Sequence, residues 1–439
     1  MNVRRFALLF FLMIAPLGAQ ETLDLAAAWT RGQSANLELA QEEQAVRQAE
    51  LDVRIQRADY LPVLGLSGSY RYVSELARLE LPFSLPDGSS PEIEAGVQNQ
   101  YDAALTLSQP LFTGFRTRNR VRASEAAYQS RQSGRQVTRN RLLLEIGILY
   151  FDMHLNRLQD AALRQGAERV RLQMERARNR LANGQATPFD TLEAATRLTQ
   201  YRLQRQVLEN EFTVLESAFG FLLNSDGPVT IDRDARTLPL ADSGDLSAQL
   251  EIAARLRPEL HQLSSLRTAL DFNRKALRSA YFPQVSAQAS YHYGRPGVNM
   301  FRDEWMDYYT VGVGLNWSLW NWGKDRRTVE KARLETQRLE LREAEIANDI
   351  RQQVTAAWES LRSLREQIVT REALLAQERE RYRITEALHR EGQVDALDVS
   401  AVESALTEAT LALEQARIRE RQVRLQLAFA TGEIGRVVP

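Results

Sequence analysis

RADYLPVLGLSGSYRY, residues 57–72, returns later in the chain as RSAYFPQVSAQASYHY, residues 278–293. Four positions match at one constant offset: Tyr60, Pro62, Tyr70 and Tyr72 recur as Tyr281, Pro283, Tyr291 and Tyr293. Farther on, NGQATPFD (residues 183–190) is followed in the same order by EGQVDALD (residues 391–398). The second offset is slightly shorter, which fits a longer loop in the first copy at LPFSLPDGSSP, residues 81–91. These landmarks predict an internal duplication.

Each copy contains two segments in which apolar and small polar residues alternate, as in strands with two different faces. They predict strands at about 62–73, 101–112, 283–293 and 308–320. Tyr and Trp gather at the segment ends, as in strands that cross a bilayer, whereas a soluble sandwich would not need aromatic ends. The residues expected to face lipid are Leu64, Leu66, Tyr70, Tyr72, Leu105, Leu107, Tyr291, Tyr293, Val311, Val313, Leu315 and Trp317.

Very long helices are expected between the strands and the end of each copy. No proline occurs between Pro110 and Pro188 or between Pro296 and Pro439, and both intervals are rich in helix-forming residues. We expect helices at about 115–182, 188–223, 323–391 and 396–430. Apolar residues of the second pair follow a heptad pattern, which predicts coiled-coil packing. They are Val354, Ala357, Leu361, Leu364, Ile368, Leu375 and Tyr382, and Val402, Leu406, Ala409, Leu413, Ala416, Val423 and Leu427.

Composition and the N-terminal stretch narrow the class of protein. The 439 residues carry 56 basic and 57 acidic side chains, and this balance argues against a nucleic-acid partner. The sequence contains no cysteine. MNVRRFALLFFLMIAPLGA, residues 1–19, has the charged, apolar and small-residue regions of a signal peptide. We therefore expect an exported protein with a first repeat at 20–224, a linker at 225–245 and a second repeat at 246–439.

Four strands in a chain cannot form a membrane barrel alone. The smallest single-chain barrels have eight strands, and unpaired strand edges are not tolerated in lipid. Two chains would give eight strands and a filled interior, whereas three chains give twelve strands and leave a lumen. The small polar residues of the second face favour a homotrimer with an open lumen.

These features together resemble the outer-membrane efflux protein family, the TolC-like export channels. The resemblance rests on the duplicated plan, on the YLP and YFP motifs that open the first strand of each copy, and on LSQPLFTG (107–114) opposite LNWSLWNWG (315–323). It implies a trimeric α-barrel of coiled-coil helices joined to a twelve-stranded β-barrel in the outer membrane of a Gram-negative-type bacterium. It also implies a passive exit duct of a tripartite efflux or type I secretion system. The implied partners are a periplasmic adaptor, an inner-membrane transporter and outer-membrane lipid.

The two turns at 183–190 and 391–398 are the candidate functional site. Gly184 and Gly392 can end a helix in a left-handed conformation, while Thr187 with Asp190 and Asp395 with Asp398 can cap the next helix. These residues can be helix-end signals alone, in which case each cap contributes about 0.5–2 kcal/mol. The resemblance implies in addition that three copies of each turn form a periplasmic aperture and a surface for adaptor docking.

A ring of Asp398 carboxylates would favour cations. Some members of the family place a second acid three residues farther on, where this chain has Ala401; Glu193, three residues after Asp190, is a possible substitute.

Nothing in the sequence points to catalysis, a cofactor or a metal site. The four histidines, at positions 154, 261, 292 and 389, do not have the spacing of metal ligands. No Gly-rich phosphate loop, nucleophile elbow or HExxH motif occurs. The alternative to an export duct is a soluble periplasmic coiled-coil scaffold or adaptor, which would expose no apolar belt.

Overall fold

The structure is a computed structural model that describes residues 21–80, 92–185, 187–225, 227–232 and 244–437. The expected signal peptide, the loop at 81–91 and most of the expected linker lie outside the described residues. The chain divides into two compact units. The first comprises residues 1–43, 134–260 and 346–439, and the second comprises residues 44–133 and 261–345.

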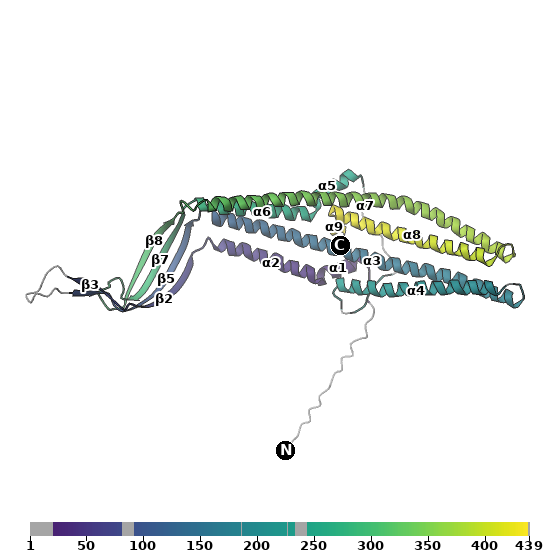
Figure 1. Cartoon of the computed structure of the whole chain (residues 1–439), viewed down its shortest axis with the longest axis horizontal. Coiled ribbons are helices and arrows are strands. Elements are labelled where there is room, and N and C mark those ends of the chain that lie inside the picture. The colour runs from purple at the N-terminus through teal and green to yellow at the C-terminus, as the bar shows by residue number, and fades with distance from the viewer. Residues whose placement is uncertain (1–20, 81–91, 186, 226, 233–243, 438–439) are drawn as a thin grey trace, which may run out of the picture. The chain divides into compact units, whose positions relative to one another are not determined.

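The second unit contains an antiparallel sheet of four strands in the order β2-β5-β7-β8 (Figure 1). The strands are β2 (Val63–Tyr72), β5 (Asn99–Phe112), β7 (Gln284–Arg295) and β8 (Met306–Asn316). A short hairpin, β3 (Ala77–Glu80) with β4 (Glu92–Ala95), lies between β2 and β5 in the chain. Strand β8 ends before the expected residue 320, because its last partner on β7 is Gln284, the first residue of that strand. Trp317 therefore lies just beyond the sheet.

The strand register places the apolar residues of all four strands on one face. Leu66 pairs with Leu105, Leu105 with Tyr291, and Tyr291 with Tyr309. Directly paired residues in neighbouring strands point to the same side of a sheet. The alternation seen in each strand alone thus becomes one continuous apolar surface, and the small polar residues form the opposite surface.

Four long helices dominate the chain: α3 (Arg116–Ala182), α4 (Pro188–Leu222), α7 (Lys324–Arg390) and α8 (Ala396–Thr431). Helices α3 and α7 each have 67 residues, about 100 Å at 1.5 Å per residue. Val354 and Leu361 of α7 pack with Val423 and Leu427 of α8, and Leu375 packs with Leu406 and Leu413, which confirms the heptad seams.

The remaining helices are shorter, and two pairs of consecutive helices are separated by a single residue. They are α1 (Leu25–Ala35), α2 (Leu37–Ala58), α5 (Leu246–Leu256), α6 (Pro258–Leu277) and α9 (Ile434–Val437), with a 3-10 turn at Arg278–Tyr281. Buried Arg257, at the break before Pro258, donates to the carbonyl oxygens of Phe429 and Ala430, which lie at the end of α8.

Among the described helices, none has the length and apolar character needed to cross a membrane.

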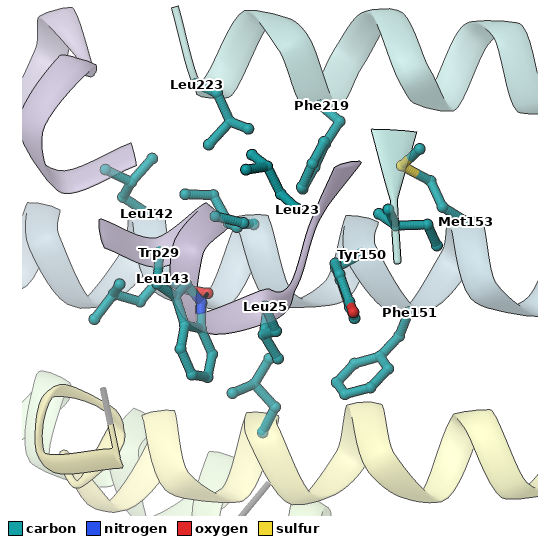
Figure 2. Close-up of a cluster of buried hydrophobic side chains, with 14 of the residues drawn as sticks. Leu23, Leu25, Trp29, Leu142, Leu143, Tyr150, Phe151, Met153, Phe219 and Leu223 are labelled. Carbon is teal, nitrogen blue, oxygen red and sulfur yellow. Dashed lines mark hydrogen bonds between the residues drawn. The ribbon is translucent and has the colours of Figure 1, made fainter. Parts of the chain in front are cut away.

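The largest apolar core lies in the first unit, where α1 packs against α3 and α8 (Figure 2). Trp29 is 1% exposed and its indole N–H donates to the carbonyl oxygen of Leu143 at 2.8 Å. Phe219 and Leu223, from the end of α4, join the same core. Strand β1 (Glu21–Leu23) lies parallel to β6 (Val229–Ile231), so the start of the described chain is held to the segment that links the two copies.

Replacing Trp29 with alanine tests whether this core holds the unit together. Trp29→Ala removes a large buried side chain and its indole hydrogen bond to the Leu143 carbonyl, so we expect a loss of about 3–5 kcal/mol. Thermal unfolding of detergent-purified protein, followed by circular dichroism, measures the loss. Thr30→Ala, an exposed neighbour on α1, should stay within about 0.5 kcal/mol of the parent. Equal midpoints for the two variants would contradict the assignment.

Candidate functional site

Both turns between the long helices close with a glycine in the left-handed region. Gly184 has φ of 71° and Gly392 has φ of 75°. The N–H of Gln185 donates to the Arg180 carbonyl at 2.8 Å, and the N–H of Gln393 donates to the Leu388 carbonyl at 3.0 Å. These bonds satisfy carbonyls that the helix ends leave free, as in a Schellman motif. A side chain at either glycine would strain the turn.

The two turns use their acids differently. In the first, the backbone N–H and the hydroxyl of Thr187 both donate to Asp190 Oδ2, at 2.9 and 3.1 Å. In the second, Asp395 Oδ1 accepts from the N–H of Asp398 at 2.9 Å. Asp190 is thus engaged in its own cap, whereas the exposed Asp398 carboxylate makes no hydrogen bond or ion pair to another residue in the described part of the chain.

The fold brings the two turns together around a cavity of about 740 Å³. Of the six residues predicted from the sequence, Thr187, Asp190, Gly392 and Asp395 line this cavity, and Gly184 and Asp398 do not. Their assignment to an aperture or a docking surface stays a prediction. Glu193 also lines the cavity, where its Oε1 accepts from the Ser400 hydroxyl at 2.9 Å. That bond joins α4 to α8.

Ion pairs that sequence reasoning missed lie in the wall of the cavity. Glu386 of α7 binds Arg176 of α3 at 2.6 Å and Arg390 at 2.9 Å. Burial alone would raise the pKa of Glu386, but hydrogen bonds from the two arginines outweigh burial and hold it below its ordinary value. On the same wall, His389 Nδ1 lies 2.9 Å from the carbonyl oxygen of Val394, within the second turn.

A buried carboxylate joins the long helices farther along the same unit. Glu403 of α8 is 0% exposed; Arg169 of α3 lies 2.9 Å from its Oε1, and the Tyr201 hydroxyl of α4 donates to its Oε2 at 2.7 Å. The Thr407 hydroxyl also donates to Oε1, at 2.9 Å. Burial raises the pKa of Tyr201, and its bond to Glu403 adds to the rise. The Arg169 guanidinium lies over the ring of Tyr382 on α7, so all four long helices take part.

One signal for this network was present in the sequence. Ser400, Glu403 and Thr407 are spaced by three and four residues, so they share one face of α8, and all three are buried. A polar stripe of this kind beside an apolar heptad seam indicates a second helix contact. Its partners, Arg169 and Tyr201, come from a distant part of the chain and had no such signal.

The apolar face of the sheet is exposed in the single chain. All twelve residues predicted to face lipid are exposed, among them Leu66 at 80% and Val311 at 75%. Aromatic rings gather beyond both ends of β8. Trp305 stacks on Tyr293 before the strand begins, and Trp320 and Trp322 are exposed after it ends. The polar face carries Asp102 and His292, 3.1 Å apart. Lipid contact of the apolar face stays a prediction, although an apolar surface of this kind indicates a membrane or a partner.

Removing the positive charge beside Glu403 tests the buried network. Arg169→Met leaves the carboxylate buried without its counter-charge, so we expect a loss of about 3 kcal/mol in thermal unfolding. The double variant Arg169→Met, Glu403→Gln removes the buried charge as well and should regain most of that loss. Equal instability of the single and double variants would show that the charge is not what the arginine balances.

Comparison with known proteins agrees with this architecture. Residues 31–217 and 249–433 each match the model of a family described as outer membrane efflux protein. One match falls in each copy, which confirms the internal duplication. Outer membrane efflux protein BepC of Brucella suis biovar 1 is 25% identical over 339 residues, which are 75% of this chain and 72% of that protein. Probable efflux pump outer membrane protein TtgC of Pseudomonas putida is 24% identical over 391 residues, 86% of this chain and 76% of that protein.

Solved structures share the fold. The structure of CusC gives a TM-score of 0.78 at 18% identity and covers 94% of this chain and 93% of its own. That of VceC from Vibrio cholerae gives 0.76 at 16% identity, covering 93% of this chain and 96% of its own. Because the two family matches cover most of the chain, the soluble scaffold is set aside: the chain belongs to the outer membrane efflux protein family and is an outer-membrane protein.

Proposed function

We propose that three copies of this chain form a passive exit duct across the outer membrane. An inner-membrane transporter supplies the energy and reaches the duct through a periplasmic adaptor. The observation that carries the proposal is the four-stranded sheet, which has one continuous apolar face, one small-polar face and two open edges.

The open edges set the number of copies. Strands β2 and β8 end the sheet order, so among the described residues each has a neighbouring strand on one side only. In lipid every unpaired backbone group costs several kcal/mol, so the edges have to pair with those of other copies. Two copies would give eight strands and an interior filled by side chains. Three give twelve strands, and the serines, glycines and threonines of the polar face then line a lumen.

The long helices suit the periplasmic part of such a duct. At about 100 Å, α3 and α7 reach far beyond the thickness of a bilayer. The cavity between the two turns is the surface we assign to the adaptor. The sequence contains no phosphate-binding loop, so the proposed duct does not energise transport by itself.

Oligomeric mass tests the proposal directly. We expect protein extracted from outer membranes in mild detergent to have the mass of three chains by light scattering, after correction for bound detergent. We also expect release by detergent only, because the apolar face of the sheet contacts lipid. A monomer or dimer that leaves the membrane in salt would overturn the duct.

The proposed aperture has a separate test in Asp398. In the proposed trimer, the three Asp398 carboxylates form a ring that favours cations. Asp398→Asn should therefore lower the ratio of potassium to chloride permeability about twofold or more. Reversal potentials across planar bilayers in a KCl gradient measure the ratio. Asp52→Asn, an exposed acid on α2, is the matched control. An unchanged ratio in Asp398→Asn would remove this residue from the aperture.

A further inference from the structure

Helix α3 begins with a run of arginines and no acid. Arg116, Arg118, Arg120 and Arg122 occupy alternate positions in its first two turns, and the first acid of the helix is Glu125. The N-terminus of a helix carries a partial positive charge, so this position favours acids and disfavours arginine. Residues that break such a local rule are expected at sites with a function.

The alternate spacing sends the four arginines to two sides of α3. Each residue of an α-helix turns by about 100°, so residues four apart share a side and residues two apart lie on opposite sides. Arg116 and Arg120 therefore form one pair, and Arg118 and Arg122 form the other. The Arg116 guanidinium donates to Gln284 Oε1 at 3.2 Å, and Gln284 belongs to the polar face of the sheet. The first pair thus lies on the polar side.

Aromatic rings connect the second pair to the apolar face of the sheet. Phe112 pairs with Val285, which pairs in turn with Leu315 of the apolar face. The rings of Phe112 and Phe115 meet edge to face, with their centroids 5.4 Å apart. The Arg118 guanidinium lies over the Phe115 ring, 4.7 Å from its centroid, and both residues are exposed. The apolar face therefore ends in an aromatic edge that carries a cation.

A ring on α6 continues this surface. The Arg122 guanidinium lies 5.6 Å from the centroid of Phe272, and the Lys275 ammonium lies 4.8 Å from the same centroid. Lys275 and Arg274 both pair with Asp271, so one carboxylate balances two cations. Three cations of two helices thus gather beside the aromatic edge, together with a single acid.

The positive charge of this surface is not balanced within the described part of the chain. Arg118 and Arg122 make no ion pair with a residue that the structure describes. Glu125, three residues after Arg122, is bound by Arg57 of α2 at 2.7 Å. Several arginines farther along α3 do pair with acids: Arg141, Arg164, Arg169, Arg171 and Arg176. An excess of cations therefore remains where the apolar face ends.

The second copy repeats the arrangement at the start of α7. The motifs LSQPLFTG and LNWSLWNWG, continued into their helices, match Arg326 to Arg118 and Trp320 to Phe112. Arg326 is exposed and makes no ion pair with a described residue. Trp320 and Trp322 are exposed as well, and their ring centroids lie 6.1 Å apart. Both copies thus place arginine just beyond an exposed aromatic edge.

We propose that Arg118 and Arg122, with Arg326 of the second copy, bind the headgroups of anionic phospholipids in the leaflet next to the long helices. The inference rests on the proposed contact of the apolar sheet face with lipid, and it adds a class of lipid at one rim. Headgroups occupy about 5–7 Å on each side of the hydrocarbon core, and Arg122 lies within about 10 Å of the start of α3.

The chemistry of the surface fits this level of a membrane. Tryptophan and other aromatic rings favour the interface, and an arginine can lay its apolar stem along the protein while its charge reaches the headgroups. Basic residues clustered beside a membrane-embedded segment attract anionic lipids. A headgroup with a net negative charge balances the cation excess, whereas a zwitterionic headgroup does not.

Native mass spectrometry of the full chain, purified in mild detergent, counts chains and bound lipids in one spectrum. With equal amounts of phosphatidylglycerol and phosphatidylcholine present, we expect the parent to retain mostly phosphatidylglycerol. Arg118→Gln, Arg122→Gln should lower the ratio of retained phosphatidylglycerol to phosphatidylcholine about fivefold or more. The matched control is Arg116→Gln, Arg120→Gln, which removes the same charge from the opposite side of α3. Its ratio should stay within about twofold of the parent.

The chain count and the lipid ratio separate the duct from the lipid site. A three-chain mass with a lowered ratio in Arg118→Gln, Arg122→Gln but not in the control supports the site. A three-chain mass with no lipid preference in the parent, or with a ratio lowered in both paired variants, in neither or in the control alone, overturns the site and leaves the duct standing. A parent mass other than three chains overturns the duct and the site with it.

A single change on another helix keeps the test valid if a paired variant fails to assemble. Arg326→Gln should lower the ratio in the same direction, because Arg326 holds the matching position in the second copy. An unchanged ratio in assembled Arg326→Gln would contradict the site in that copy.

Discussion

The open edges of the sheet are the constraint on which the proposed assembly depends. Backbone groups on the outer sides of β2 and β8 have no strand partner in the described part of the chain. Lipid offers no hydrogen bonds in place of such partners. In the proposed function a single chain is therefore incomplete, however well its own core packs. A cyclic arrangement of copies, as in the proposed duct, would pair the two edges with each other.

Duplication gives the chain two similar halves, but their contacts are not equivalent. Helices α3 and α7 have the same length, and α4 and α8 differ by one residue. The acids at the turns have diverged: Asp190 is bound in its cap, while Asp398 is not. The two copies meet at Glu403, where a carboxylate from the second copy is held by an arginine and a tyrosine from the first. Removing one partner of such a pair is strongly destabilising, because the other charge is then left buried without compensation.

Local patterns in the sequence predicted the regular elements well. The absence of proline and the richness in helix-forming residues revealed the long helices, and alternation revealed the four strands together with their apolar face. Features that depend on contacts between residues far apart in the sequence were not predicted. The pairing of β1 with β6 involves three residues on each side, too few to show a period. The partners of Glu403 come from far along the chain, and the cavity at the turns exists only because two hairpins lie together. Trp317 was expected within a strand, and β8 ends before it because β7 offers no partner there.

The parallel pair of β1 and β6 has a consequence for the order in which the chain folds. Residues 21–23 leave the export machinery long before residues 229–231, so their strand partner does not yet exist when they arrive. Trp29 and the rest of α1 likewise depend on Leu143 and on Leu425 near the end of α8. Contacts of such sequence separation form slowly, since a long loop has to close first. Strand β1 and helix α1 are thus among the last elements to become ordered, although they precede their partners in the chain.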